Sequence, residues 1–400
     1  MKTLDFHTNL GLFAKTSKLS AMILRGIKDH FDVSLPEYGK NHMPGAITPE
    51  LQEKYTPYLK PQRKPDIKLF YDLPTTWKID KSCKNIGIFG WETNKLPSRD
   101  LLLAPHIHPA SFNWVNILNN LDEVWCLSKS TEAAVQQSGV IKPTKVIHPA
   151  IDTSFWKPGN WTTSKTIVGL DHETNGDEIS DKFVVGFVGE WCHKNDVVSL
   201  IKCVMTGLPA NDCVMIFKTH SMKPGVTREL LHNTIKKLKT ETYLPKVPNI
   251  IVLDDYVSDE EYRAILNRVH VYASISKGES LNLQAIEAMS LGKLGVLSLG
   301  TGNLEFFKHN QNGLGVEMMP ELAYNPDEGI MPSSPFYSSD QVWGKAYELQ
   351  FIGHLQAVYG AWKEDKTIEK YKRMGVIGSE NVRKEYGEEQ FAKFLKTASK

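Results

Sequence analysis

Strand-like and helix-like runs alternate along this chain, and the alternation constrains its fold more than any other feature. Short apolar runs predict buried strands at 85–89, 123–126, 144–147, 183–188, 214–218, 250–253, 269–273 and 295–299. Helix-forming runs precede, separate and follow them, at 19–27, 131–137, 197–206, 228–239, 259–267, 283–291 and 388–397. This order favours an α/β fold of doubly wound parallel sheets. In such sheets ligands bind at the carboxyl ends of the strands, beside the topological switch point.

The length of the chain predicts two domains. Its 400 residues exceed what a single hydrophobic core commonly supports. We expect a first Rossmann-like domain over residues 1–155, a linker over 156–182 and a second Rossmann-like domain over 183–384. The cleft between two such domains is then the expected ligand site.

Composition predicts a cytoplasmic, reduced protein. The hydrophobic share of 41% and the charged share of 23% are ordinary for a globular chain. No apolar run reaches the ~18–20 residues that span a bilayer, and no signal-peptide pattern opens the sequence. The cysteines form no CxxC pair and stand mostly in apolar contexts, which favours buried thiols over disulfides or a metal site. They are Cys83, Cys126, Cys192, Cys203 and Cys213.

The net charge of +1 conceals a division between the two parts of the chain. Residues 1–150 hold 19 Lys and Arg against 14 Asp and Glu, which leaves 28 against 32 for the remainder. A solvated surface explains this surplus; a front half that meets an anionic acceptor also explains it. The basic residues gather at Lys54, Lys60, Arg63, Lys64, Lys68, Lys78, Lys81 and Lys84.

The segment from Ser276 to Gly292 carries the strongest chemical signal. It places Glu279 in a turn rich in Gly and Ser, and Glu287 within an apolar, helix-forming run. Their separation along a single helix would turn one side chain away from the other by roughly 80°. If the helix begins between them, both carboxylates flank its amino end, where free N–H groups bind anions. This arrangement suits a nucleotide sugar, with phosphates at the helix start and hydroxyls on the carboxylates.

The same segment resembles the signature of glycosyltransferase family 4, the retaining GT-B enzymes. Further stretches resemble the family in the same order along the chain: Gly90–Glu92 with Leu96–Pro97, Asp122–Ser128, Val146–Pro158 and Phe183–Gly189. The resemblance implies a GT-B fold, two Rossmann-like domains facing across a cleft, with the last helix (about 385–400) packing back on the first domain. It implies transfer of a sugar, with retention of configuration, from a UDP- or GDP-type donor to a hydroxyl of a glycan or lipid-linked glycan.

The resemblance also implies roles for individual residues of the donor site. Glu287 would bind the ribose hydroxyls and Glu279 the transferred sugar. Lys194 would neutralise the departing diphosphate, with Lys218 assisting because Glu190 stands where many relatives have an arginine. Further binding residues are Ser280, Leu281, Asn282 and Leu283 at the helix start, Gly11 in a glycine loop of the first domain, and Tyr256, which would stack on the nucleobase. Ser280 and Asn282 replace glycines that are common in the family.

On the acceptor side, His106 and His108 would point to one face of an extended segment. His108 is a candidate base or acceptor contact, and Glu92 would orient the acceptor. A metal on the two histidines fits their spacing, but no third ligand is near in sequence. Without an Asp-x-Asp motif we expect no obligatory divalent ion, so positioning and electrostatics would supply the catalysis.

Other functions remain open from the sequence. The basic front half is compatible with a phage-type DNA glycosyltransferase that acts on a hydroxymethylated base. A glycosidase could use Glu279 and Glu287 as acid and base, although carboxylates at one helix start do not resemble an opposed pair. A GT-B-like epimerase or a non-catalytic sugar-nucleotide binding protein is the third possibility.

Overall fold

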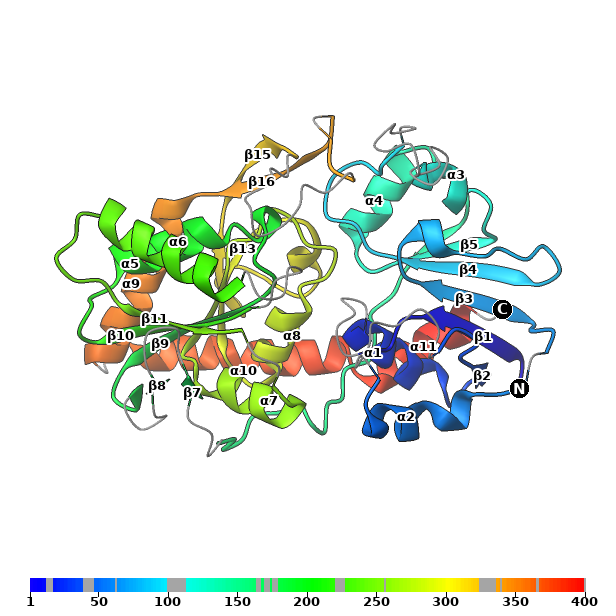
Figure 1. Ribbon diagram of the computed structural model, residues 1–400, viewed down its shortest axis with the longest axis horizontal. Helices are drawn as coiled ribbons and strands as arrows, with labels where there is room; N and C mark the ends of the chain where they lie inside the picture. Colours follow the sequence, from blue (N-terminus) through cyan, green and yellow to red (C-terminus); the bar gives the residue numbers. More distant parts are fainter. Residues whose placement is uncertain are drawn as a thin grey trace. The chain divides into compact units, whose positions relative to one another are not determined.

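The computed structural model of the chain forms two compact units. One contains Met1–Thr153 together with Lys384–Lys400, and the other contains Ser154–Arg383. Each is built on a parallel sheet of six strands (Figure 1), which confirms the predicted α/β class of two Rossmann-like sheets. The structure describes residues 1–11, 17–38, 47–61, 63–98, 113–162, 167–168, 173–174, 179–219, 227–254, 257–323, 336–338, 340–364 and 367–398.

The first unit has a sheet in the order β2-β1-β3-β4-β5-β6. Its strands are β1 (Thr3–Thr8), β2 (Asp32–Ser34), β3 (Ile67–Tyr71), β4 (Lys84–Phe89), β5 (Glu123–Cys126) and β6 (Thr144–Val146). Its helices are α1 (Ser17–Ile27), α2 (Pro49–Tyr55), α3 (Trp114–Leu118), α4 (Lys129–Gln137) and α11 (Glu388–Ala398), with short 3-10 helices at Thr56–Tyr58 and Pro74–Thr76. The predicted strands and helices of this region are confirmed to within two residues, whereas β1, β2 and β3 were not predicted.

The C-terminal helix α11 packs inside the first unit. A Cβ on Gly26 of α1 would come within 2.3 Å of the Phe391 ring, so only glycine permits this approach of α1 to α11. The ring centroid of Phe394 lies 5.0 Å from that of Trp125 on β5 in an edge-to-face contact. The last helix therefore completes the apolar layer on one face of the sheet.

The second unit has a sheet in the order β11-β10-β9-β12-β13-β14. Its strands are β9 (Phe183–Val188), β10 (Cys213–Lys218), β11 (Asn249–Leu253), β12 (Val271–Ser274), β13 (Leu294–Ser298) and β14 (Gly313–Val316). Its helices are α5 (Val197–Gly207), α6 (Thr227–Glu241), α7 (Asp259–Arg268), α8 (Leu283–Ser290) and α9 (Glu348–Glu364). The helix α10 (Ile368–Glu385) follows α9 along the chain. Every strand and helix predicted within this region is confirmed to within two residues.

Side chains of the second sheet alternate between two apolar cores. Phe183, Val185 and Phe187 of β9 join the core that includes α5, α6 and α9. Val184, between them, joins a smaller core with Ile265 of α7. Figure 1 shows α6 and α7 over opposite faces of this sheet. Burial on both faces explains why these strands read as continuous apolar runs in the sequence.

Two short antiparallel pairs lie outside the main sheets. The ribbon β15 (Met318–Leu322) and β16 (Val342–Ala346) belongs to the second unit, as does the small pair β7 (Ile167–Val168) and β8 (Glu173–Thr174). Neither pair was predicted. Among the described residues, no helix combines the length and the apolar character that crossing a membrane requires.

Candidate functional site

The topological switch point of the second sheet lies between β9 and β12. From β9 the chain builds β10 and then β11 on one side, and it returns to the other side of β9 as β12. The segments that follow β9 and β12 therefore leave the same edge of the sheet as neighbours. Residues 189–196 follow β9, and residues 275–282 follow β12. This edge is where a doubly wound sheet binds its ligand.

Lys194 and Glu279 meet at this edge. Lys194 lies on a single 3-10 turn, η5 (His193–Asn195), and its Nζ is 3.2 Å from Glu279 Oε2. The ammonium also donates to the carbonyl oxygen of Gly278 at 3.4 Å, and the main-chain N–H of Lys277 donates to the carbonyl oxygen of Lys194 at 2.8 Å. The two side chains are 19% and 16% exposed. The structure thus brings together two of the three residues predicted as catalytic.

The turn that carries Glu279 is held by residues from another segment. Thr301 Oγ1 accepts the main-chain N–H of Glu279 at 2.7 Å, and the N–H of Gly302 donates to the Glu279 carbonyl oxygen at 2.7 Å. A Cβ on Gly302 would lie 2.5 Å from the carbonyl oxygen of Ser280. Thr301 has φ +47°, a conformation that costs a β-branched residue free energy. The two hydrogen bonds and the close backbone approach fix the position of the Glu279 turn, and they hold Thr301 in its strained conformation.

The helix predicted between the two glutamates begins where the sequence indicates. Asn282 is the N-cap of α8, and its side chain accepts the main-chain N–H of Ala285 at 3.1 Å. Leu283 donates its N–H to the carbonyl oxygen of Leu281 at 3.0 Å. Within the described part of the chain, the main-chain N–H groups of Leu281 and Asn282 donate to no acceptor. They are the donors that an anion at this helix end would use.

Glu287 lies inside α8 and is buried. It is 4% exposed, and the hydroxyl of Tyr262 on α7 donates to its Oε2 at 2.8 Å. Burial first, and then the charge of Glu287, hold the pKa of Tyr262 well above its ordinary value, so the phenol keeps its proton. Glu287 is therefore not an exposed carboxylate that merely favours the start of a helix, because it is buried and has a hydrogen-bond donor on another helix. Tyr262 was missed because nothing in the sequence relates it to a residue of the next helix.

The remaining predicted residues lie on other segments than the Lys194–Glu279 pair, or outside the described part of the chain. Lys218 ends β10 in register with Val188, and its Nζ donates to the carbonyl oxygen of Thr219 at 3.3 Å. Gly11 belongs to the first unit, where its N–H donates to Asn9 Oδ1 at 3.0 Å. His106, His108 and Tyr256 lie outside the described residues. In the described ranges no group of three or more His, Cys, Asp or Glu side chains could hold a metal ion.

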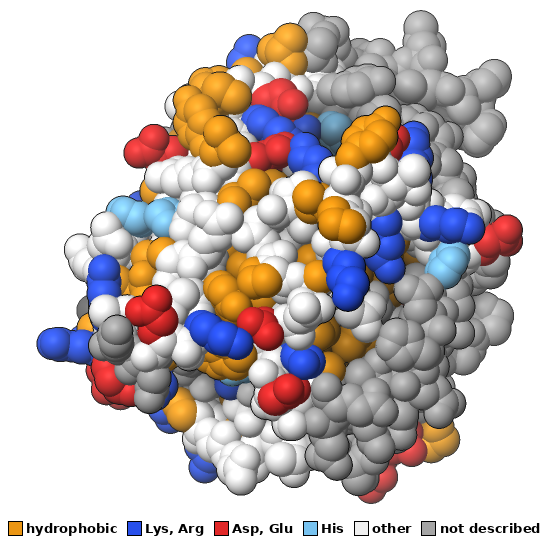
Figure 2. Space-filling view, turned by 90° about the vertical axis from the view of Figure 1, so that its left-hand side faces the viewer, with side chains coloured by type: hydrophobic (Ala, Val, Ile, Leu, Met, Phe, Trp, Pro, Cys, Tyr) orange, Lys and Arg blue, Asp and Glu red, His pale blue; other side chains and the backbone are white. Residues whose placement is uncertain are grey.

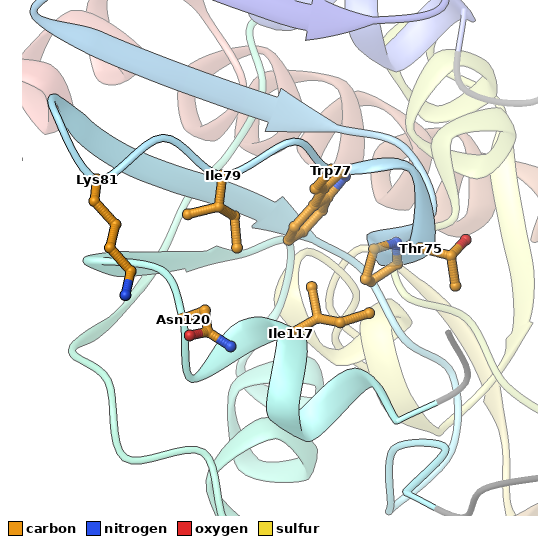
Figure 3. A pocket seen from close by; sticks show the side chains of 7 residues that line it. Thr75, Trp77, Ile79, Lys81, Ile117 and Asn120 are labelled. Carbon is orange, nitrogen blue, oxygen red and sulfur yellow. The ribbon is translucent and has the colours of Figure 1, made fainter. Parts of the chain in front are cut away.

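The first unit has a pocket of about 290 Å³ beside its sheet (Figure 3). Trp77, Ile79 and Ile117 point into it, and Lys81 and Asn120 lie at one end. None of the predicted site residues lines this pocket. Its lining is mixed, because Thr75, Lys81 and Asn120 place polar groups beside the aromatic and aliphatic side chains.

Four of the eight basic residues that the sequence groups together in the first unit bind carboxylates. Lys60 and Arg63 both bind Asp32. Lys68 lies 3.2 Å from Asp80, and Lys84 lies 2.9 Å from Glu123. Figure 2 shows a face of the second unit, where basic side chains lie among acidic and apolar ones. These ion pairs fix the positions of basic side chains but do not cancel the surplus, which is an excess of cations over carboxylates.

The fold is shared with solved structures of low sequence identity. Anabaena HepE in complex with UDP-glucose matches with a TM-score of 0.62 and 15% identity over 100% of both chains. Sucrose-phosphate synthase from Thermosynechococcus elongatus matches with a TM-score of 0.61 and 12% identity, over 100% of this chain and 98% of that one. Trehalose-6-phosphate synthase OtsA matches with a TM-score of 0.64 and 10% identity, over 100% and 99%. These likenesses show a GT-B fold. No protein-family model and no curated protein matches the chain.

Proposed function

We propose that this chain is a glycosyltransferase that uses a nucleotide-diphosphate sugar as donor and a hydroxyl of a glycan or lipid-linked glycan as acceptor. One observation carries the proposal: the Lys194–Glu279 pair and the amino end of α8 lie together at the switch point of the second sheet. A cation and free main-chain N–H groups suit a diphosphate, and adjacent carboxylates suit sugar hydroxyls. HepE, which shares the fold, has UDP-glucose bound, and this supports a UDP-type donor.

Each residue has one role in this proposal. The diphosphate binds the N–H groups of Leu281 and Asn282, and Lys194 opposes the charge that develops on the leaving group. Glu279 accepts hydrogen bonds from the transferred sugar. Glu287, oriented by Tyr262, accepts them from the ribose. Lys218, at the same edge, adds positive charge.

We further propose that transfer retains the anomeric configuration. The acceptor oxygen forms a bond to the anomeric carbon on the face that the diphosphate leaves, while the bond from that carbon to the phosphate oxygen breaks. The acceptor proton passes to a phosphate oxygen, so no carboxylate needs to become a covalent nucleophile. The protein contributes position, fixed charge and exclusion of water.

A ligand screen followed by one substitution tests the donor site. A nucleotide sugar at about 100 times its Kd stabilises the folded state by about 2.7 kcal/mol, or roughly 5 to 11 °C in Tm for a unit of this size. UDP-glucose and other UDP- and GDP-sugars are therefore tested by thermal shift. The single amide oxygen of Glu287→Gln can still accept the Tyr262 hydroxyl, so this variant should fold normally. The amide has no second acceptor oxygen for the ribose, so the variant should lose most of the shift in Tm.

The matched control is Glu369→Gln, which removes an exposed carboxylate on α10 and should keep the full shift. Glycan, lipid-linked and hydroxymethylated DNA acceptors are then compared by product formation. If no nucleotide sugar raises Tm, or if Glu287→Gln leaves the shift unchanged, the donor site is misassigned. Consumption of donor without any acceptor would favour an epimerase or a hydrolase.

A further inference from the structure

Lys277, two positions before Glu279, is a buried lysine with partners on two other segments. Its side chain is 3% exposed, and its Nζ lies 2.6 Å from Glu321 Oε2 on β15. The same Nζ lies 2.9 Å from His193 Nε2 on η5. Because an ammonium can only donate, His193 accepts through Nε2 and carries its proton on Nδ1. The side chain of Lys277 thus joins the ribbon β15–β16 to the turn that carries Lys194.

The second strand of the ribbon strengthens the same junction. The N–H of Gly344 on β16 donates to the carbonyl oxygen of Lys277 at 2.8 Å. Trp343 donates its indole N–H to Glu321 Oε2 at 3.0 Å, and its ring centroid lies 5.6 Å from Lys277 Nζ. Glu321 therefore accepts from a lysine and a tryptophan at once, which fixes the carboxylate.

The ribbon also binds the far end of the Lys194 turn. Lys345 on β16 donates to Asp196 Oδ2 at 2.6 Å and to Ser199 Oγ at 2.8 Å. Asp196 has φ +48°, which is unfavourable for a residue with a side chain. The turn His193–Asn195 is consequently held at both ends: Lys277, which is paired with Glu321, contacts its first residue, and Lys345 contacts the residue after its last.

We propose that the ribbon β15–β16 is a clamp that positions Lys194 for the diphosphate, with Lys277, Glu321 and Lys345 as positioning residues. This inference rests on the proposed donor site. The clamp acts on Lys194 through the backbone of η5, because the N–H of Lys277 also donates to the Lys194 carbonyl oxygen. Loss of the clamp would let the ammonium move away from the place where charge develops, and small displacements of such groups are costly to catalysis.

Two measurements on the full chain test the clamp. In the first, UDP-glucose binding is titrated by calorimetry at pH 8. Glu321→Gln should weaken binding tenfold or more, whereas the control Glu369→Gln should not change it. His193→Gln, whose amide oxygen can still accept from Lys277, should bind as tightly as wild type.

The second measurement needs no donor. With 5-fluorotryptophan incorporated, the Trp343 fluorine signal is the one that Trp343→Phe removes. It should shift in Glu321→Gln and stay near its wild-type position in His193→Gln, which keeps an acceptor for Lys277. If wild type binds no nucleotide sugar, the donor site is wrong, and the fluorine signal still decides whether the Lys277–Glu321 pair holds Trp343. A signal that does not move in folded Glu321→Gln overturns the clamp. Unchanged UDP-glucose affinity in folded Glu321→Gln overturns its positioning role.

Discussion

The hydrogen bond from Tyr262 to Glu287 gives the most direct energetic test of the donor site. Tyr262→Phe removes only the hydroxyl and keeps the ring, which packs against Trp156 with centroids 5.7 Å apart. The lost bond is 2.8 Å long, is buried and ends on a carboxylate. Hydrogen bonds to charged groups contribute about 1.5–3 kcal/mol. We therefore expect the free energy of unfolding to fall by about 2 kcal/mol, or Tm by roughly 4–8 °C.

A second tyrosine of the same unit provides a matched control. The hydroxyl of Tyr359 donates to Asp212 Oδ2 at 2.7 Å, but Lys363 Nζ also lies 2.9 Å from that oxygen. The Asp212 side chain is 31% exposed. The residue immediately precedes β10, so it lies at the amino end of the strand, the opposite edge of the sheet from the candidate site. Tyr359→Phe should therefore cost no more than about 1 kcal/mol and should leave UDP-glucose affinity unchanged.

The assay combines unfolding in urea with titration of UDP-glucose. Tyr262→Phe should weaken donor binding about tenfold, which corresponds to about 1.4 kcal/mol, because Glu287 is no longer held in one orientation. A double-mutant cycle with Glu287→Ala, which removes the acceptor of this bond, should show a coupling energy of about 1.5–3 kcal/mol. Equal losses in the Tyr262 and Tyr359 variants, or a coupling energy near zero, would refute the reasoning that this bond orients a donor ligand.

Three further predictions follow from single features. Lys194→Met should lower kcat/KM by about 10²–10³ with less than about 1 kcal/mol lost in stability, because its ion pair is partly solvated; unchanged turnover would contradict its role. Gly302→Ala should destabilise by about 1–3 kcal/mol through contact with Ser280, whereas Gly353→Ala, with open space around it in α9, should stabilise by about 0.5–1 kcal/mol; urea unfolding compares the two. Burial lowers the pKa of His270 to about 4, so between pH 6.5 and 4 the unfolded chain binds more protons than the folded chain. The free energy of unfolding should therefore decrease as the pH is lowered through this range, by up to about 3 kcal/mol. His270→Phe should flatten that slope in Tm measured against pH, although it also removes the acceptor of the Val184 N–H.

Sequence reasoning succeeded where the signal was local. The strands of the second sheet are apolar on both faces, so the runs around Phe183 and Val214 are recognisable without any partner. The start of α8 was predictable because Asn282 is a natural N-cap before an apolar, helix-forming run. Strand β1 was missed because it carries Asp5, a buried carboxylate whose pKa burial raises, within an otherwise sheet-like segment. Polar residues in a buried strand hide the pattern that identifies it.

The contacts that organise the candidate site were beyond sequence reasoning because they join distant segments. Lys277 is part of the recognised segment, yet its partner Glu321 lies on a ribbon that contains Pro320 and has no clear strand pattern. The role of Gly302 follows from one carbonyl oxygen that only the folded chain places beside it. Likewise, the basic surplus was visible as a count, but its pairing with Asp32, Asp80 and Glu123 depends on sheet register.

Two lysine–glutamate pairs share the turn that carries Lys277 and Glu279, and they differ in exposure to solvent. Lys194 and Glu279 are partly solvated and 3.2 Å apart, so a diphosphate can replace the carboxylate without leaving either charge buried and unpaired. Lys277 is 3% exposed and 2.6 Å from Glu321, and breaking such a pair leaves an uncompensated buried ammonium. Replacing the carboxylate partner therefore costs little free energy for Lys194 and much more for Lys277. The physical chemistry assigns ligand binding to the first pair and the fixed frame around it to the second.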